Sequence, residues 1–243
     1  MQTHRSFLED IIDESIELQP MEPAGFDQYL LQGWRFLGYS IIRHNFAVSR
    51  GRICRTIPLR IRLDEHFTLS KSQRQLLRRN AHLQVHCAPI RITPEKEALF
   101  FTHTERFQDR HPLSVYSFLH PHAHEMPVSG LEFTVRDGER LVACSYFHIG
   151  ENAISGTYCF FDPAYNQLSP GAFTMLLELQ LAQQMGKQYY YHGYTYDVPS
   201  QFDYKLNFNN LESMDWVTGE WSACARVPVR KWDEESQNIK GKM

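Results

Sequence analysis

The chain has 243 residues with 42% hydrophobic and 22% charged residues and a net charge of −3, which fits one large globular domain or two small ones that share a core. It lacks an apolar run long enough to span a bilayer and a basic-then-apolar signal pattern, so we expect a cytoplasmic protein with no membrane partner. Its five scattered cysteines form no C-x-x-C pair, which excludes a disulfide framework and a thiolate zinc site and predicts no cofactor.

The N-terminal stretch predicts two helices separated by prolines. Apolar residues recur at helical spacing from Ser6 to Leu18, with acids between them, and this pattern predicts an amphipathic helix. Pro20 and Pro23 end it, and a second short helix is expected to run to about Gln32. The Arg-rich stretch that follows is predicted to hold short strands near residues 39–44 and 57–63.

A basic block lies within this otherwise acidic chain. Residues 33 to 92 hold twelve Lys and Arg residues but only two acidic residues, Asp64 and Glu65. This asymmetry predicts a polyanionic partner, and we assign residues 1–92 to a basic N-terminal region that binds it and residues 93–243 to a second region. The alternative is that these arginines pair with the acidic stretch from Glu9 to Asp27.

One helix within the basic block has a clear start signal. Ser70-Lys71-Ser72-Gln73 fits a capping box, and the helix it opens should run to about Asn80. Its basic side chains lie at helical spacing and are candidates for phosphate contact: Lys71, Arg74, Arg78 and Arg79. A strand is then expected from Gln84 to Ile90, a helix from Thr93-Pro94 with Leu99, Phe100, His103 and Phe107 inward, and a helix from Leu113 to Leu119.

The second half predicts a β-β-α-β order. Runs rich in β-forming residues at 141–149 and 153–161 are joined by Gly150-Glu151-Asn152 as a hairpin. Ser169 and Pro170 suit the N-cap and first position of a helix that ends at Gly186, and residues 188–194 form an aromatic strand. This order places a helix N-terminus at the carboxyl end of a strand, where anionic or acyl ligands often bind.

Two clusters of residues suggest chemistry. The turn from Asp162 to Ser169 offers a carboxylate, a hydroxyl and free helix N–H groups, although simple helix capping is the alternative. His120, His122 and His124 form an H-x-H-x-H run that suits a metal only on a strand. Because Pro121 lies within this run and Pro127 follows it, we expect a loop and predict no metal site.

Several ordered segments match the signature motifs of one known family. They are Gly33-Trp34-Arg35 with Gly38, Pro58-Leu59-Arg60, Ser70 through Asn80, Arg110-His111, Glu132-Phe133, Ser155 with Tyr158 and Phe161-Asp162-Pro163, Ser169 with Gly171, Gly193-Tyr194, and Tyr204-Lys205 with Phe208. Agreement of several ordered motifs is more specific than one. On these residues the chain resembles the arginyl- and leucyl-type aminoacyl-tRNA–protein transferases of the N-end rule pathway.

This resemblance implies an α/β (α+β) protein with a GNAT-like acyltransferase fold, a mixed central sheet flanked by helices and an N-terminal basic subdomain. It implies an enzyme that takes an amino acid, arginine or leucine, from aminoacyl-tRNA and joins it to the N-terminal amine of a protein or peptide with an acidic first residue. An acyl-CoA-dependent N-acyltransferase and a non-catalytic tRNA-binding relative are the alternatives. The oligomeric state stays open.

The resemblance also suggests roles for particular residues. The basic helix would hold tRNA phosphates, and the aminoacyl ester would lie near Ser169. Catalytic candidates are Asp162, Ser169, Glu132 and Tyr204, and substrate-binding candidates are Arg110, His111, Tyr158, Tyr194 and Lys205. The chain departs from the family at three points: Thr56 stands where family members carry a cysteine before the P-x-R strand, Pro170 replaces leucine in S-L-G, and His192 replaces leucine in L-G-Y.

Overall fold

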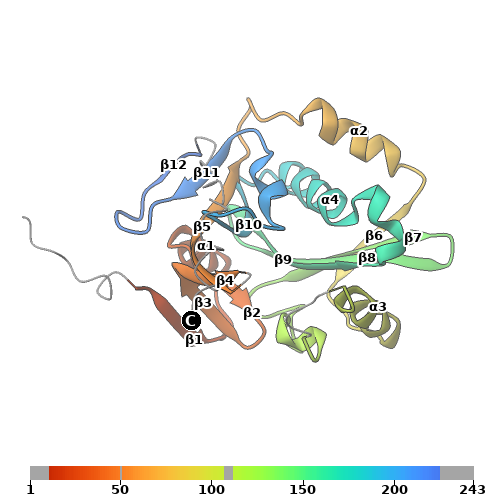
Figure 1. The fold of residues 1–243 in the computed structure, drawn as a ribbon, viewed down its shortest axis with the longest axis horizontal. Helices are drawn as coiled ribbons and strands as arrows, with labels where there is room; N and C mark the ends of the chain where they lie inside the picture. Colours follow the sequence, from red (N-terminus) through yellow and green to blue (C-terminus); the bar gives the residue numbers. More distant parts are fainter. Residues whose placement is uncertain (1–10, 50, 107–111, 225–243) are drawn as a thin grey trace, which may run out of the picture.

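The computed structural model describes residues 11–49, 51–106 and 112–224. Within these ranges a nine-stranded mixed sheet forms the centre of the molecule (Figure 1). Its strands run in the order β12 (Trp221–Ala223), β11 (Leu211–Met214), β5 (Arg52–Arg62), β10 (Tyr189–Tyr196), β9 (Ala153–Phe161), β8 (Arg140–Ile149), β7 (Gly130–Asp137) and β6 (Gln84–Pro89), while β4 (Phe46–Ser49) pairs with β5. The pairs are antiparallel except that of β9 with β10, which is parallel.

Helices cover both faces of this sheet. Helices α4 (Pro170–Gln184) and α2 (Lys71–Arg79) lie on one face, and α3 (Pro94–Thr104) lies on the other (Figure 1). Consecutive residues of a central strand are therefore both buried, because each points into a different core. In β8, Tyr146 packs beside Phe100 of α3, while Phe147 packs beside Leu179 of α4. The predicted α/β class with a mixed sheet flanked by helices is confirmed.

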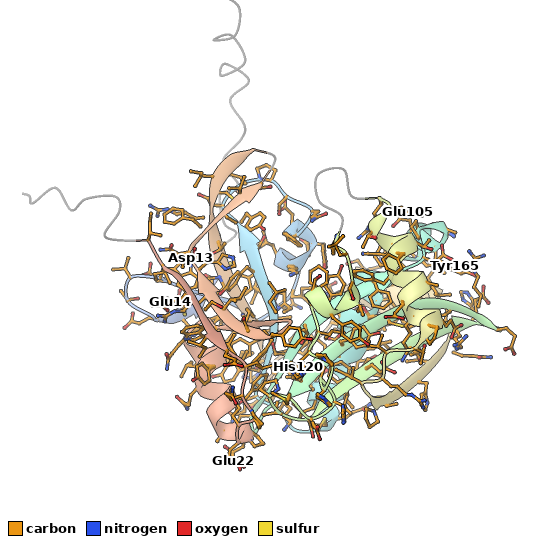
Figure 2. The ribbon with its side chains drawn as sticks, turned by 90° about the horizontal axis from the view of Figure 1, so that it is seen from below. Asp13, Glu14, Glu22, Glu105, His120 and Tyr165 are labelled. Carbon is orange, nitrogen blue, oxygen red and sulfur yellow. The ribbon has the colours of Figure 1, made fainter. Side chains whose placement is uncertain are left out.

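A smaller three-stranded sheet lies beside the main one. Its order is β1 (Asp13–Glu17), β3 (Ser40–His44) and β2 (Arg35–Leu37), and α1 (Pro23–Leu31) packs with it. Their shared core contains Phe26, Phe36 and Tyr191. In the view from below, Asp13 and Glu14 of β1 lie on one side of the molecule, and Glu105 after α3 and Tyr165 lie on the other (Figure 2).

Most helix boundaries follow the predicted caps. Ser70 accepts the Gln73 amide while the Gln73 side chain accepts the Ser70 amide, so the capping box of α2 is confirmed. Thr93 accepts the Lys96 amide at the start of α3. Helix α4 begins at Pro170 as predicted, but the Ser169 side chain makes no capping bond because its backbone takes the left-handed conformation, with φ 50°. The short 3₁₀ helix η3 (Pro163–Leu168) ends at that residue.

Two predicted helices are wrong. The first predicted helix covers residues 6 to 18, of which residues 6 to 10 lie outside the described residues. The described part contains the strand β1 and not a helix. Pairing of β1 with β3 overrides the apolar spacing, since Ile16 lies opposite Ile41 in the ladder. The stretch from Leu113 to Leu119 forms only the 3₁₀ helix η2 (Val115–Ser117). Phe107, expected to face the core, lies outside the described residues.

The parallel strands β9 and β10 separate partway along their length. They pair from Ala153 opposite Tyr189 to Ser155 opposite Tyr191. Beyond that point the register of β10 with β5 shifts between Tyr191 and Gly193, and the register of β9 with β8 shifts at Thr157. These two bulges turn the strands apart and leave an opening, which we call the fork. Within the described residues, no helix is long and apolar enough to cross a membrane.

Candidate active site at the fork between β9 and β10

A cavity of about 170 Å³ occupies the fork. Strand β9 contributes residues 155–157 to its wall, and β2 and β3 close it from one face. The polar side chains with ionisable groups that line it are those of Arg35, His44, His192, Tyr194 and Lys205. Because none of these is a carboxylate, the cavity is suited to an anionic ligand.

Arg35 is a buried cation with no carboxylate partner among the described residues. Its guanidinium donates to the carbonyl oxygens of Trp34 at 2.7 Å and Leu59 at 3.3 Å, and its Nε has no partner within the described part of the chain. The rings of Tyr191 and Tyr194 lie 5.3 and 5.4 Å from the guanidinium. Burial lowers the pKa of Arg35.

Lys205 brings a second cation to the same cavity. It belongs to the 3₁₀ helix η4 (Asp203–Leu206), and its Nζ lies 3.4 Å from the Tyr194 carbonyl. Burial and the positive charge of Arg35 lower its pKa to about 8. Gly193, at φ 91°, makes room for this ammonium, because a Cβ there would lie 3.2 Å from Nζ. Two cations that repel each other without an acid between them indicate a site for a bound anion.

His192 and Tyr194 complete this wall. The Nε2 of His192 lies 3.2 Å from the Lys205 carbonyl, and burial with the nearby Lys205 lowers the His192 pKa to about 3. The imidazole is therefore neutral. Tyr194 donates its hydroxyl to the Gly33 carbonyl at 2.5 Å and packs its ring edge-on against His44 at 5.1 Å. The predicted substrate-binding residues Tyr194 and Lys205 thus lie in one cavity.

A polar cluster lies behind the fork, on the face covered by α4. Glu178 of α4 is buried, and Tyr190 of β10 donates its hydroxyl to Oε2 of Glu178 at 2.7 Å. Burial raises the pKa of Glu178 to about 7, against the lowering effect of the Tyr190 hydroxyl. Tyr204, a predicted catalytic residue, and Cys159 face the same cluster, and each has its pKa raised first by burial and further by Glu178.

The start of α4 holds the next two predicted catalytic residues. Asp162 ends β9, and its Oδ1 accepts the Ala164 amide at 2.9 Å. Its Oδ2 accepts two bonds from Arg140, at 2.9 and 2.5 Å. Asp162 therefore caps η3 and forms an ion pair with Arg140. This agrees with the alternative stated above, that the turn serves only to cap a helix. Ser169 is half-buried at the junction of η3 and α4.

The basic helix α2 leads to this junction. The side chain of Asn80, at the C-terminal end of α2, donates to the Leu168 carbonyl at 3.1 Å, next to Ser169. All four predicted phosphate-binding residues are exposed along the helix: Lys71, Arg74, Arg78 and Arg79. Other members of the basic block have structural partners, such as Arg60 with Glu212 at 2.7 Å. The predicted pairing with the acidic N-terminal stretch is seen for Arg43, which contacts Glu14.

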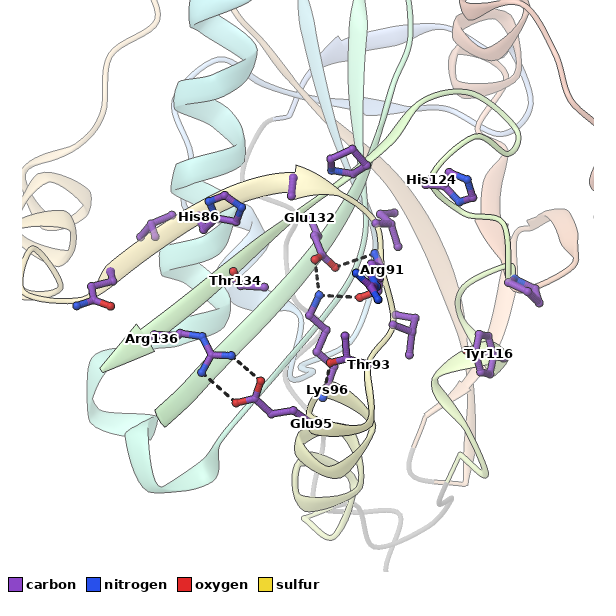
Figure 3. Close-up of a pocket in the computed structure, with 17 residues that line it drawn as sticks. His86, Arg91, Thr93, Glu95, Lys96, Tyr116, His124, Glu132, Thr134 and Arg136 are labelled. Atoms are coloured by element: carbon purple, nitrogen blue, oxygen red, sulfur yellow. Dashed lines mark hydrogen bonds and ion pairs between the residues drawn. The ribbon is translucent and has the colours of Figure 1, made fainter. Parts of the chain in front are cut away.

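Glu132 lies in a different hollow, of about 950 Å³, formed by β6, β7, the start of α3 and part of the segment 116–124 (Figure 3). Its carboxylate forms a buried ion pair with Lys96 and accepts the Arg91 amide at 3.3 Å. Arg136 pairs with Glu95 in the same hollow. Glu132 does not line the fork cavity, so the structure does not bring it together with the fork residues. The acidic side chains of the larger hollow are already paired with cations, and the smaller cavity is therefore the better candidate site.

The remaining predicted residues lie apart from the fork cavity or outside the described residues. The Tyr158 ring stacks on Phe118, with centroids 3.9 Å apart, and its buried hydroxyl has no partner within the described residues. Arg110 and His111 fall in a segment that is not described.

Three functional candidates were missed from the sequence. Arg35 lies in the Gly33-Trp34-Arg35 motif, which by itself assigns it no role. His192 is notable in the sequence only because it replaces the leucine of the L-G-Y motif. Glu178 had a signal of its own, because it is the one charged residue in the apolar run from Met175 to Leu181.

The cysteines do not form a thiolate set. All five fall within the described residues and form no disulfide. The buried Cys54 donates its thiol to the Ala47 carbonyl, and the Thr56 hydroxyl donates to the His44 carbonyl at 2.5 Å. The position where the family has a cysteine is therefore part of a strand contact. A cysteine-ligated group does not fit these residues, and no chemistry is derived from one.

Known proteins of similar sequence extend over most of the chain. Residues 90–215 match the family model described as arginine-tRNA-protein transferase, C terminus. An aspartate/glutamate leucyltransferase of Shewanella is 32% identical over 200 residues and 78% of each chain, and one of Chromohalobacter salexigens is 29% identical over 224 residues and 86% of each chain. The structure of L-PGS from Bacillus licheniformis has a TM-score of 0.46 at 12% identity, covering 74% of this chain and 52% of that one. The chain therefore belongs to the arginine-tRNA-protein transferase family, enzymes that transfer an amino acid from an aminoacyl-tRNA to a protein.

Proposed function

We propose that this enzyme transfers leucine from leucyl-tRNA to the N-terminal amine of a protein whose first residue is aspartate or glutamate. The names of the similar leucyltransferases support the donor and the acceptor. The observation that carries the acceptor choice is the pair Arg35 and Lys205, two cations in one cavity without a carboxylate partner among the described residues. The side-chain carboxylate of the acceptor would supply the missing charge, by charge-assisted hydrogen bonds.

The placement of the donor follows from the basic helix. We propose that Lys71, Arg74, Arg78 and Arg79 contact tRNA phosphates. The bond from Asn80 to the Leu168 carbonyl then brings the bound RNA close to the start of α4. The free N–H groups of that helix start, beside Ser169, suit the developing negative charge of the ester carbonyl. Since charged tRNA is the donor, we place the reaction in the cytoplasm.

The fold supports the same assignment at a finer level. We propose that residues 93–243 form a GNAT-like transferase region and that residues 1–92 contribute the tRNA-binding helix. The order β8, β9, α4, β10 supports a GNAT-like region, because it places two parallel strands side by side and separates them at the cavity. Tyr204, beside the cluster behind the fork, stays a catalytic candidate, as does Ser169. Asp162 and Glu132 have structural partners that occupy their carboxylates.

The test is transfer of labelled leucine to peptides that differ only in their first residue: Asp, Glu, Asn, Gln or Ala. We expect Asp and Glu peptides to react and their amides to react at least tenfold more slowly, because a buried charge is left unpaired. Replacement of Lys205 or Arg35 by methionine should reduce this preference by about 1.5–3 kcal/mol, the usual contribution of a hydrogen bond to a charged group. Arg136→Met, in the larger hollow beside Glu95 and outside the fork cavity, is the matched control and should keep the preference.

Two further arms separate the alternatives. Arginyl-tRNA offered in place of leucyl-tRNA tests the donor. Acyl-CoA thioesters should neither react nor shift the melting temperature, because the enzyme uses charged tRNA. Equal transfer to Asp and Asn peptides would show that the two cations do not select the acceptor. Binding of charged tRNA without transfer to any peptide would instead indicate a non-catalytic relative.

A further inference from the structure

The transfer reaction needs a group that removes a proton from the acceptor. A protein N-terminus is largely an ammonium near neutral pH, with a pKa of about 8, and an ammonium cannot attack an ester. Among the described residues, those that line the fork cavity include no carboxylate. His192 is a poor acceptor, since burial lowers its pKa to about 3. A proton acceptor must therefore lie at the edge of the cavity instead of on its wall.

Gly156 marks the place where a carboxylate reaches that edge. It lines the cavity, just beyond the point where β9 loses its pairing with β10. A Cβ built on Gly156 would lie 2.9 Å from Oε2 of Glu178 and 2.8 Å from the Tyr190 hydroxyl. Any larger residue at this position would have to displace the Glu178 carboxylate and the Tyr190 hydroxyl. The glycine thus leaves the carboxylate separated from the fork by backbone alone.

Among the residues that the structure describes, no cation forms an ion pair with Glu178. The titratable groups that face it are Tyr190 from β10, Cys159 from β9 and Tyr204 from η4, and none of these is positively charged. The Tyr190 hydroxyl donates to Oε2 of Glu178, and the Ser145 hydroxyl of β8 also lowers its pKa, but both of these groups are neutral. A buried carboxylate without a cationic partner is costly to fold, so a function for it is expected.

We propose that Glu178 is the catalytic base that takes the proton from the acceptor's N-terminal ammonium, and that Tyr190 positions it. The proposal rests on the proposed function. It complements the cation pair, because an acidic N-terminal residue carries one carboxylate for Arg35 and Lys205 and one ammonium for Glu178. The two glycines Gly156 and Gly193 face the opening, one backed by the carboxylate and the other by the lysine ammonium.

The acceptor nitrogen loses two protons during the transfer. The Glu178 carboxylate takes one proton from the ammonium, and the neutral amine attacks the ester carbonyl carbon of the aminoacyl-tRNA. A C–N bond forms and the C–O bond to the ribose breaks. The second proton lost by the nitrogen ends on the ribose oxygen, which leaves as the tRNA hydroxyl. Glu178 then releases its proton to solvent, so that each turnover liberates one proton.

The test is the pH dependence of kcat/KM for an Asp peptide with leucyl-tRNA. The wild-type profile should be bell-shaped, with a lower limb near pH 7 from Glu178 and an upper limb near pH 8, where Lys205 loses the charge that binds the acceptor carboxylate. Glu178→Gln should lower kcat/KM at pH 7.5 on the order of 10²- to 10⁴-fold and remove the limb near pH 7. The variant protein should keep its fold, since glutamine can still accept the Tyr190 hydroxyl.

Two tyrosine variants separate catalysis from packing. Tyr190→Phe should move the lower limb to higher pH, because the hydroxyl that favours the charged carboxylate is gone. Tyr146→Phe, an equally buried tyrosine on the other face of β8, should leave that limb in place. A merely structural Glu178 would lower the rate of its variant without changing the shape of the profile.

Two results would overturn the proposal. One is a Glu178→Gln profile that keeps the lower limb. The other is a Glu178→Gln defect that is confined to the KM for leucyl-tRNA, because the carboxylate would then bind the ammonium of the donor amino acid and not that of the acceptor. Such results leave the proposed function standing if wild-type enzyme still prefers acidic peptides. If wild-type enzyme transfers leucine to no peptide, the proposed function itself is wrong.

Discussion

Replacement of Glu178 by glutamine should change the pH dependence of folding stability in a direction opposite to ordinary carboxylates. The pKa of Glu178 is raised from 4.5 to about 7 in the folded protein. Between these two pH values the folded state holds a proton that the unfolded state has released, so stability falls as pH rises through this window. Above pH 7 both states are ionised and the loss is complete.

The size of this effect follows from the shift. One pKa unit corresponds to about 1.4 kcal/mol, so a shift from 4.5 to about 7 removes roughly 3 kcal/mol of unfolding free energy between pH 4.5 and pH 8. Glutamine has no proton to release. The stability of the variant relative to wild type should therefore increase by about that amount over the same window. Its magnitude is an upper limit, because any relaxation of the α4 face would reduce it.

Urea unfolding of both proteins at several pH values measures this difference directly. Asp215 provides a control of opposite sign, since the amides of Thr218 and Val217 lower its pKa. Asp215→Asn should destabilise the protein near neutral pH, with a smaller loss in acid. A free-energy difference between Glu178→Gln and wild type that stays constant from pH 4.5 to pH 8 would refute the reasoning, because the carboxyl would then titrate alike in both states.

Three other variants test separate parts of the structure. Ser70→Ala removes the capping box of α2 and should cost about 1 kcal/mol of stability in urea unfolding, whereas Ser222→Ala, on the short edge strand β12, should cost much less. The double variant Arg74→Ala with Arg78→Ala should lower the slope of log K against log salt for tRNA binding by about 1.4 to 1.8, and an unchanged slope would remove α2 from the RNA contact. Leu179→Ala, at a fully buried position of α4, should cost about 2–5 kcal/mol, and a loss below 1 kcal/mol would mean that the α4 core is not packed as described.

Local signals determined how much of the fold could be predicted. Caps and turns depend on neighbours in sequence, so the box at Ser70, the Thr93 cap and the hairpin at Gly150 were predictable. The strand β1 was not, because its pairing with β3 depends on residues almost thirty positions away. The same limit applied to Ser169, whose left-handed backbone is set by the turn from η3 into α4.

The site was predictable only where a motif named its residues. Tyr194, Lys205 and Tyr204 lay in recognised segments, and the structure brings the first two into one cavity. Arg35 and Glu178 acquire meaning only from what surrounds them. A buried arginine without an acid and a buried glutamate without a base cannot be distinguished, in a sequence, from members of ordinary ion pairs.

Strand β5 comes from the first quarter of the chain, yet it lies between β11 and β10. The segment that matches the family model begins at residue 90, after this strand has ended. A fragment starting there would leave β10 and β11 with a missing neighbour and two unpaired edges in the middle of a sheet, which invites aggregation. Truncation studies of this enzyme should therefore retain β5, since the portion that matches the family model and the smallest portion able to fold are different lengths of chain.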